Sequence, residues 1–508
     1  MLGKGVRLVR RHWLATLIVA NAVALLCFRH FVSLDGPMYL LHAAVQKDAW
    51  LGITREAQGI RADASVQDLN LGDLLLIPLV GVVCPFFLHK LLAVVAVTSV
   101  CLGAWRLACA YGRVNAAWVL VLPCSFGFVL ILGLFHFMIG SGLAMGGVGW
   151  WVSRRAVRWK EPGLLVLLCA LATFAHTACG ALLLLLVATN ELVILLGDRV
   201  AWRSRWAALP GWLVPALVCV SVIIALGAIA TRFSGAPVQP HEPHHPVREL
   251  LTLRPLLLLD SASEQPFRIA IGAVLLALIG LAMVDRLKHG VRQGDGLLAC
   301  AILLLLISFI RTPRTELMYI TDRAQWLALL LVACWLSTRP LPVRPLLVFA
   351  AAVIALHTAR QVFFERRMAD LRPRDRAVRL AGTTFEPDAL VIPVVLGNDW
   401  LARHITAYAA VRHRGLVFTG RDHLRFAWGL APEAHVRNYI LSPENDWTWI
   451  GDHNRDGLAP DLRQILVVGE ADKSQLPTWN TLLATLKRDY TLTTDQVYAQ
   501  VWTRKTGP

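Results

Sequence analysis

An aspartate lies directly after the first long apolar stretch of the chain, in the segment SLDGPMYLLHA at residues 33–43. A carboxylate placed there could take the proton from an acceptor hydroxyl as that hydroxyl attacks, a contribution of about 10²–10⁴-fold to a reaction rate. Asp is also a favoured helix N-cap, and Pro37 suits a first helical turn. The residue types therefore fit two roles for Asp35, a catalytic base or the cap of a helix lying along the membrane surface.

Cationic and polar side chains accumulate in other segments that would reach the same side of a membrane. Arginine suits phosphate oxygens because its planar guanidinium donates two parallel hydrogen bonds. A phosphate attached to a long lipid would reach such side chains from within the bilayer. Single Arg and Tyr residues also serve as ordinary interfacial anchors. The candidates for binding the lipid phosphate or substrate are Arg323, Arg311, Arg314, Arg248, His176, His42 and Tyr319.

Three histidines of the segment HEPHHPVREL raise the question of a metal site. His241, His244 and His245 lie among prolines and a glutamate, a composition that favours a solvated loop which orders on binding. No Cys/His spacing in the sequence is typical of zinc. We therefore predict no metal ligands and no cofactor, and leave a requirement for a divalent metal open.

The elements that must position these residues are apolar helices. Of 508 residues, 56% are hydrophobic and 17% are charged, which is typical of a membrane protein rather than a soluble one. Many apolar runs approach or exceed the length that crosses a bilayer. The clearest cover residues 13–28, 91–111, 163–174, 181–196, 212–230, 269–284, 297–310, 326–336 and 345–356. The sequence predicts a polytopic α-helical membrane protein.

The net charge of +16 orients the protein and does not indicate nucleic acid, because Lys and Arg cluster in short blocks between apolar runs. With a cytoplasmic N-terminus, the pattern predicts about 11 net crossings and an extracytoplasmic C-terminus. Residues 116–151 are long enough for two further crossings, yet two full crossings would put the basic block RRAVRWK outside. We therefore predict a broken or re-entrant pair there, which must be buried in protein.

The chain divides into a multi-span membrane domain at residues 1–358 and a small extracytoplasmic α/β domain at 359–508. Within the second domain, DALVIPVVL, GLVFTG, RQILVVGE and VYAQVWTR have the pattern of strands, and LARHITAYAAVRHR and LPTWNTLLATLKRDY have helical spacing. It contains neither GxGxxG nor a Walker pattern. A lid or assembly role is therefore the expectation for it.

Taken together, these segments resemble the GT-C membrane glycosyltransferases, which include the protein O-mannosyltransferases and the lipid A aminoarabinose transferases. The resemblance covers nearly the whole chain through short motifs. They are SLDGPMYLLHA at 33–43, GLFHFMIGSGLAMGG at 133–147, FAHTACGALLLL at 174–185, YITDR at 319–323 and HITAYAAVRHRGLVF at 404–418. The last of these is similar to the segment that comes after the spans in other bacterial members.

The resemblance implies an inverting transfer of a sugar from a polyprenyl-phosphate donor to an extracytoplasmic acceptor, which would be a glycan, lipid or protein. It places the enzyme in the bacterial cytoplasmic membrane, with Asp35 as general base and the outer arginines, Arg323 first, on the lipid phosphate. One departure is clear. Mannosyltransferase relatives carry an adjacent Asp-Glu pair, whereas Gly36 follows Asp35 here. Another acid, Asp48, Asp63 or Asp68, would then assist, or one acid would suffice.

Two other classes of function stay open. A transporter or flippase for a lipid-linked glycan predicts an internal repeat and polar residues at mid-membrane. We find no repeat in the sequence, and only His136 and Asn21 suggest a polar pathway. A non-catalytic scaffold with an outer binding domain predicts that Asp35 acts only as a helix cap.

Overall fold

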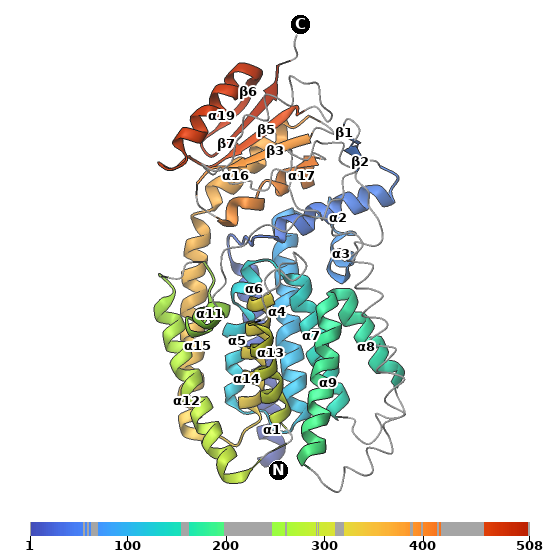
Figure 1. Ribbon diagram of the computed structural model, residues 1–508, viewed down its shortest axis with the longest axis vertical. Coiled ribbons are helices and arrows are strands. Elements are labelled where there is room, and N and C mark those ends of the chain that lie inside the picture. Colours follow the sequence, from blue (N-terminus) through green and yellow to red (C-terminus); the bar gives the residue numbers. More distant parts are fainter. Residues whose placement is uncertain are drawn as a thin grey trace. The chain divides into compact units, whose positions relative to one another are not determined.

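A computed structural model describes much of the chain (Figure 1). The described residues are 2–53, 56–57, 60–61, 70–153, 162–197, 246–259, 262–290, 292, 294–309, 320–386, 390–397, 400–413, 416–417 and 462–505. The chain forms two compact units. The helical unit comprises Met1–Phe28, Asn70–Gly72 and Leu92–Phe364, and the mixed unit comprises Arg29–Leu69, Asp73–Leu91 and Glu365–Pro508.

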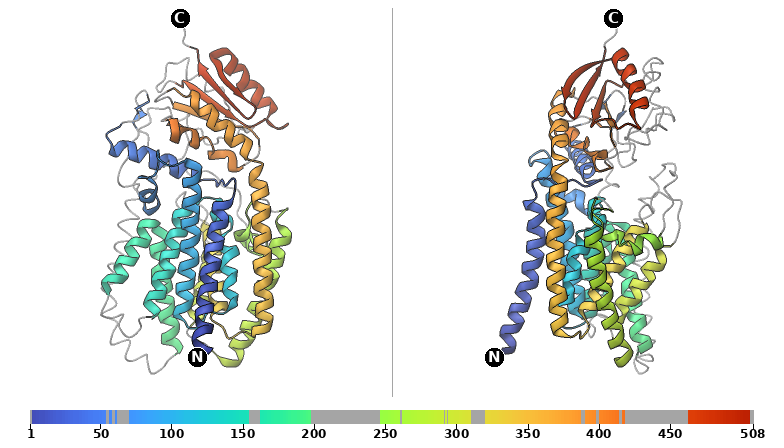
Figure 2. Two further views of the ribbon diagram at one scale, coloured as in Figure 1. Left: turned by 180° about the vertical axis from the view of Figure 1, so that it is seen from behind. Right: turned by 90° about the vertical axis from the view of Figure 1, so that its left-hand side faces the viewer.

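Long apolar helices build the helical unit. Among the described residues, α4, α12 and α15 are long and apolar enough to cross a membrane, which agrees with a multi-pass membrane protein. Helices α7, α8 and α9 pack side by side, as do α13 and α14 (Figure 2). The main helices are α1 (Leu2–Cys27), α4 (Pro85–Ala110), α7 (Phe135–Ser153), α8 (Pro162–Ala175), α9 (Thr177–Gly197), α12 (Gln265–His289), α13 (Asp295–Ile307), α14 (Ile320–Ser337) and α15 (Val343–Ala369).

The number of crossings stays a prediction, because the expected span at 212–230 lies outside the described residues. The basic block RRAVRWK at 154–160 lies outside them as well. Two short helices, α11 (Pro246–Leu251) and η4 (Arg254–Leu256), follow residues 198–245, which lie outside the described part of the chain.

The segment predicted to be broken is broken in the structure. It consists of η2 (Ala116–Leu120), α5 (Val121–Ser125) and α6 (Phe128–Ile131), followed by α7. Gly133, between α6 and α7, has a φ of 80°, a left-handed conformation that glycine adopts without steric cost. Residues 117–142 are all buried. Burial in protein is what an interrupted helix requires at membrane depth.

Buried donors satisfy the carbonyl groups that these breaks expose. The Arg360 guanidinium donates to the Pro123 carbonyl oxygen at 3.1 Å, to that of Phe126 at 2.5 Å and to that of Leu256. The Trp326 indole donates to the Cys124 carbonyl oxygen at 2.7 Å. Because hydrocarbon offers no hydrogen bonds to exposed backbone, these side chains replace the missing helical ones.

The mixed unit contains a five-stranded sheet in the order β4-β3-β5-β7-β6. Strand β3 pairs in parallel with β4 and β5, and β7 pairs antiparallel with β5 and β6. The central strands are buried along their length, from Val391 in β3 and throughout β5. The strands are β3 (Leu390–Val395), β4 (Leu416–Val417), β5 (Gln464–Val468), β6 (Tyr490–Gln496) and β7 (Ala499–Arg504). A separate two-stranded ribbon pairs β1 (Glu56–Ala57) with β2 (Ile60–Arg61).

Helices of the mixed unit come from both ends of the chain. Helix α17 packs against α2, so the segment that carries Asp35 lies against a helix encoded more than 350 residues later (Figure 1). Helix α15 crosses the predicted domain boundary at 358–359 without a break. The helices are α2 (Gly36–Trp50), α3 (Leu71–Leu76), α16 (Arg372–Ala381), η6 (Gly382–Thr384), η7 (Trp400–His404), α17 (Ala407–His413) and α19 (Leu476–Asp489).

Candidate functional site

Asp35 lies at the start of α2, where its side chain makes no capping hydrogen bond. The backbone carbonyl of Asp35 accepts from Met38 N at 3.0 Å, as in any helical turn. The N–H of Gly36 donates to the Ser33 hydroxyl at 3.2 Å. Ser33 therefore satisfies the helix start, and capping does not account for a carboxylate at position 35.

A histidine from the C-terminal part of the mixed unit lies beside this carboxylate. His404 Nε2 is 3.7 Å from Asp35 Oδ1, and the two side chains are 1% and 12% exposed. This separation is too long for a hydrogen bond, but it places an imidazole nitrogen next to the carboxylate in a poorly solvated position. His404 is not among the site residues predicted from the sequence. In the sequence, the one feature that points to His404 is its position at the start of the segment HITAYAAVRHRGLVF.

His89 forms a polar bridge within the same unit. Its Nε2 lies 2.8 Å from the Ser33 hydroxyl, and its Nδ1 is hydrogen-bonded to the Tyr408 hydroxyl. Phe31 packs edge-on against the imidazole at a centroid separation of 5.2 Å. The imidazole is fully buried and both of its nitrogens are engaged. The segment before Asp35 is thereby tied to α4 and to α17.

His89 also explains why glycine follows Asp35. A Cβ at position 36 would collide with the His89 imidazole and come within 2.5 Å of the Ser33 hydroxyl oxygen. The adjacent acid of the mannosyltransferase pattern has no space here. Asp48 does not replace it, because 13 residues along α2 separate it from Asp35 by about 20 Å at 1.5 Å per residue. Asp63 and Asp68 lie outside the described residues.

His42, a predicted substrate-binding residue, pairs with a carboxylate on α3. His42 Nδ1 is 3.4 Å from Asp73 Oδ2, and the Asp73 side chain is fully buried. Farther along α2, the Lys47 ammonium donates to the Val80 carbonyl oxygen at 2.5 Å. These contacts hold α2 against α3 and against the segment that follows α3.

A second His–Asp pair of the mixed unit joins His30 and Asp375. His30 Nδ1 lies 3.5 Å from Asp375 Oδ2, and both side chains are buried. Burial raises the pKa of Asp375 to about 8, although Arg379 nearby lowers it. Burial, with Lys90, Arg379 and Arg372 close by, lowers the pKa of His30 to about 4. At neutral pH the carboxyl group therefore carries the proton and the imidazole is neutral.

In the helical unit, two of the predicted binding residues, Arg323 and His176, contact the same aromatic ring. The Arg323 guanidinium lies over the Phe137 ring, 5.2 Å from its centroid, and the His176 ring packs edge-on against Phe137 at 5.3 Å. Arg248 is exposed on α11. The other predicted phosphate ligands, Arg311, Arg314 and Tyr319, lie outside the described residues.

Arg254 is a cation of the helical unit to which the sequence assigns no role. Its guanidinium bridges two carboxylates, Glu249 at 3.0 Å and Asp322 at 3.1 Å, and stacks over Phe128 at 4.8 Å. Its charge is therefore balanced by side chains of its own unit, which favours a structural role for Arg254.

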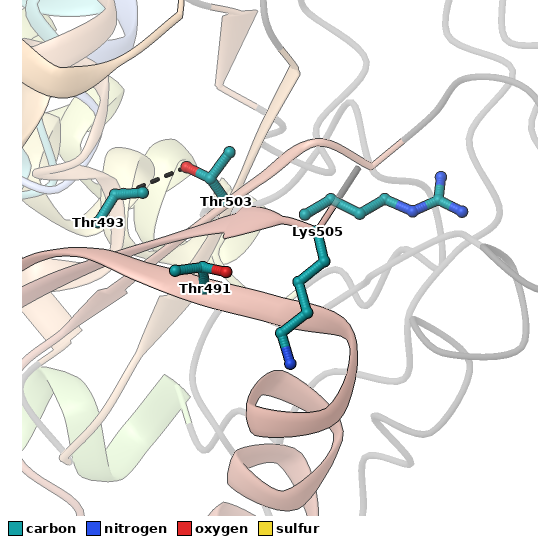
Figure 3. Close-up of a pocket in the computed structure, with 5 residues that line it drawn as sticks. Thr491, Thr493, Thr503 and Lys505 are labelled. Atoms are coloured by element: carbon teal, nitrogen blue, oxygen red, sulfur yellow. Dashed lines mark hydrogen bonds between the residues drawn. The ribbon is translucent and has the colours of Figure 1, made fainter. Parts of the chain in front are cut away.

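Among the described residues, we also considered metal clusters and surface depressions as alternatives to Asp35. In the described part of the chain no cluster of His, Cys, Asp or Glu is arranged to hold a metal. A shallow depression of about 310 Å³ on β6 and β7 is lined by Thr491, Thr493, Thr503, Arg504 and Lys505 (Figure 3). Lys505 there donates to the carbonyl oxygens of Lys487 and Arg488, so it caps α19.

The helices and the sheet form a fold that is also found in solved structures. Neither a protein-family model nor a curated protein matches the sequence. Two solved structures share the fold at a TM-score of 0.59 each: ArnT from Cupriavidus metallidurans in the apo state, 13% identical over 100% of both chains, and the same protein bound to undecaprenyl phosphate, 12% identical over 98% of both.

ArnT is a lipid A aminoarabinose transferase of the GT-C superfamily. The likeness extends over the full length of both chains, and it confirms the resemblance predicted from sequence at the level of the fold. At 12–13% identity it does not transfer an activity.

Proposed function

We propose that the protein is an inverting glycosyltransferase of the GT-C type, which moves a sugar from a polyprenyl-phosphate donor to an extracytoplasmic acceptor. The observation that carries the proposal is the fold shared along the whole chain with ArnT, one structure of which holds undecaprenyl phosphate. The Asp35 carboxylate also supports the proposal, because its helix does not use it as a cap and a carboxylate can act as a general base.

In the proposed reaction Asp35 acts as the general base. The acceptor oxygen attacks C1 of the sugar, and its proton passes to the Asp35 carboxylate as the new C–O bond forms. The bond between C1 and the phosphate oxygen breaks, and its electron pair leaves with the polyprenyl phosphate. Attack opposite the leaving group inverts the configuration at C1. General-base assistance of this kind contributes about 10²–10⁴-fold.

The leaving phosphate needs positive charge, which arginines supply in this proposal. Arg323 is the first candidate, because a planar guanidinium can donate two parallel hydrogen bonds to phosphate oxygens. Further candidates are Arg311, Arg314, Arg248 and Tyr319. His176 is another, because its ring and the Arg323 guanidinium both contact the Phe137 ring. His42, on the helix that Asp35 precedes, is proposed to contact substrate.

The proposed location is the bacterial cytoplasmic membrane. The basic blocks between apolar runs favour a cytoplasmic N-terminus, which would place Asp35, the acceptor site and the C-terminal sheet outside. A lipid-linked donor would then reach the site from the bilayer.

The proposal is tested with purified protein in lipid nanodiscs. The protein is incubated with undecaprenyl-phosphate-linked pentoses and hexoses and with envelope fractions as the acceptor source, and released undecaprenyl phosphate is quantified by mass spectrometry. We expect acceptor-dependent release with at least one donor and an inverted anomeric configuration in the product. Transport of a lipid-linked sugar across proteoliposomes without any release would contradict the proposal and favour the flippase alternative.

A further inference from the structure

We infer that His404 is a positioning residue for Asp35, contributed to the reaction centre by the C-terminal part of the chain. The inference rests on the proposed function, since it concerns how the proposed base is held. It gives that part of the chain a direct role in the chemistry, beyond a lid or an assembly surface.

The first support is geometric. His404 Nε2 lies 3.7 Å from Asp35 Oδ1, with both side chains largely withdrawn from solvent. The helix that begins after Asp35 does not orient its carboxylate, because the N–H at its start donates to Ser33. His404 is a side chain outside that helix which reaches the carboxylate and can orient it.

The second support is a chain of hydrogen bonds that joins the segment before Asp35 to the segment after His404. Tyr408, four residues after His404, is hydrogen-bonded to His89, and His89 is hydrogen-bonded to Ser33, two residues before Asp35. All three side chains in this bridge are buried. The bridge fixes the position of the segment that carries His404 relative to the segment that carries Asp35. The proximity of the two side chains therefore follows from the packing of the fold.

A nitrogen at this place has a chemical use in the proposed reaction. An imidazole N–H facing one carboxylate oxygen holds the group in one orientation and leaves the other oxygen for the acceptor hydroxyl. A separation of 3.7 Å can shorten to a hydrogen bond once substrate is bound, because catalytic contacts are often longer in the free enzyme. His404 exchanges no proton in this step, because the acceptor proton goes to Asp35.

Three substitutions separate this role from simple packing. His404→Gln places an amide nitrogen near the position of Nε2, His404→Asn places one near Nδ1, and His404→Leu removes polarity. His289→Leu serves as matched control, because His289 pairs with Asp285 at 2.9 Å on the exposed end of α12. Turnover is measured with the undecaprenyl-phosphate-linked sugar that the wild type uses, and folding is followed by thermal unfolding in detergent.

We expect His404→Leu and His404→Asn to lower kcat by about 10–100-fold, the range in which groups that orient a reactive ligand act, with the KM for the donor within about two-fold. His404→Gln should recover kcat to within about three-fold of wild type. The control should not change either constant. Because residues that act as a unit are not additive, His404→Leu should cost nothing more in an Asp35→Asn background.

Full activity of His404→Leu, or equal activity of the Gln and Asn variants, would overturn the inference. If His404→Leu does not fold, the comparison of Gln with Asn decides alone. Loss of activity in Asp35→Asn with normal activity in His404→Leu would refute the role of His404 and leave the proposed function standing. Full activity in Asp35→Asn would refute the proposed base, and the role of His404 would fail with it.

Discussion

Gly36 shows how one residue excludes the acid pair of a related branch. In the sequence it is only a departure from the Asp-Glu pattern. In the structure the space beside its Cα is filled by His89 and Ser33. The sequence could not reveal this, because His89 lies more than 50 residues away and is brought there by the fold.

Gly36→Ala should therefore destabilise the protein by about 1–3 kcal/mol, the usual cost of forcing an extra group into a packed site. Thermal unfolding in detergent measures it. Gly280→Ala is the control, because nothing lies within 4 Å of a Cβ at that helical position, and Ala there should stabilise by about 0.5–1 kcal/mol. Equal stability of the two variants would contradict the packing account.

The His30–Asp375 pair predicts a dependence of stability on pH. Asp375 has a raised pKa of about 8, so its contribution is present at low pH and lost as pH rises through that value. His30 has a lowered pKa of about 4, so its contribution is present at high pH and lost as pH falls. Between about 4 and 6.5 the native and unfolded pairs each hold one proton, and the two effects cancel.

From pH 6.5 to 8 only the native pair holds a proton, so stability should fall by about 2 kcal/mol at 1.36 kcal/mol per pH unit. Asp375→Asn should abolish this decline. Unfolding temperatures at pH 6.5 and 8 for both proteins measure it. An equal decline in the variant would show that other groups cause it.

At the scale of elements, the broken segment illustrates what sequence can and cannot predict. Its length and the polar, glycine-containing interruption predict a break within 116–151, and the structure has one. Arg360, which satisfies the exposed carbonyl groups, falls within residues 359–508, which the sequence assigns to the extracytoplasmic α/β domain. Only the fold shows that its guanidinium is fully buried.

Substitution of Arg360 tests this role. Arg360→Lys keeps the charge but loses the planar fork, and the carbonyl groups of Pro123, Phe126 and Leu256 cannot all be satisfied by one ammonium. We expect a loss of about 3–5 kcal/mol or failure to accumulate in the membrane. Arg344→Lys, at an exposed position of the same helix, is the control and should have no effect.

Among the sheet elements, apolar runs predict β3 and β5, which are buried. Strand β6 (YTLTTDQ) has no such run because most of its side chains are exposed at the edge of the sheet. Its pairing with β7, rather than its composition, makes it a strand.

At the scale of the whole molecule, the mixed unit is assembled from three separate stretches of sequence. A division at 358–359 follows the change in composition, and that division stays a prediction. Composition cannot show that α2 packs against α17 and η7, since such contacts join segments hundreds of residues apart. His404 could not be predicted as a site residue for the same reason.

Tyr408→Phe tests this assembly. Removing the hydroxyl breaks the bridge through His89 to Ser33, so amide hydrogens of residues 36–50 should exchange faster, by about 5–10-fold for a loss of about 1 kcal/mol. Tyr111→Phe removes a comparable bond, to Asn190, in the helical unit and should leave that segment unchanged. Equal exchange in both variants would show that the bridge does not stabilise α2.

The most direct measurement of the central claim is the release of undecaprenyl phosphate by Asp35→Asn and Asp35→Ser proteins. Both replacements can cap a helix, and the structure assigns the cap bond to Ser33, so both variants should fold like wild type. If Asp35 is the general base, turnover falls at least about 100-fold in each. Wild-type turnover in a well-folded Asp35→Ser protein would contradict the account.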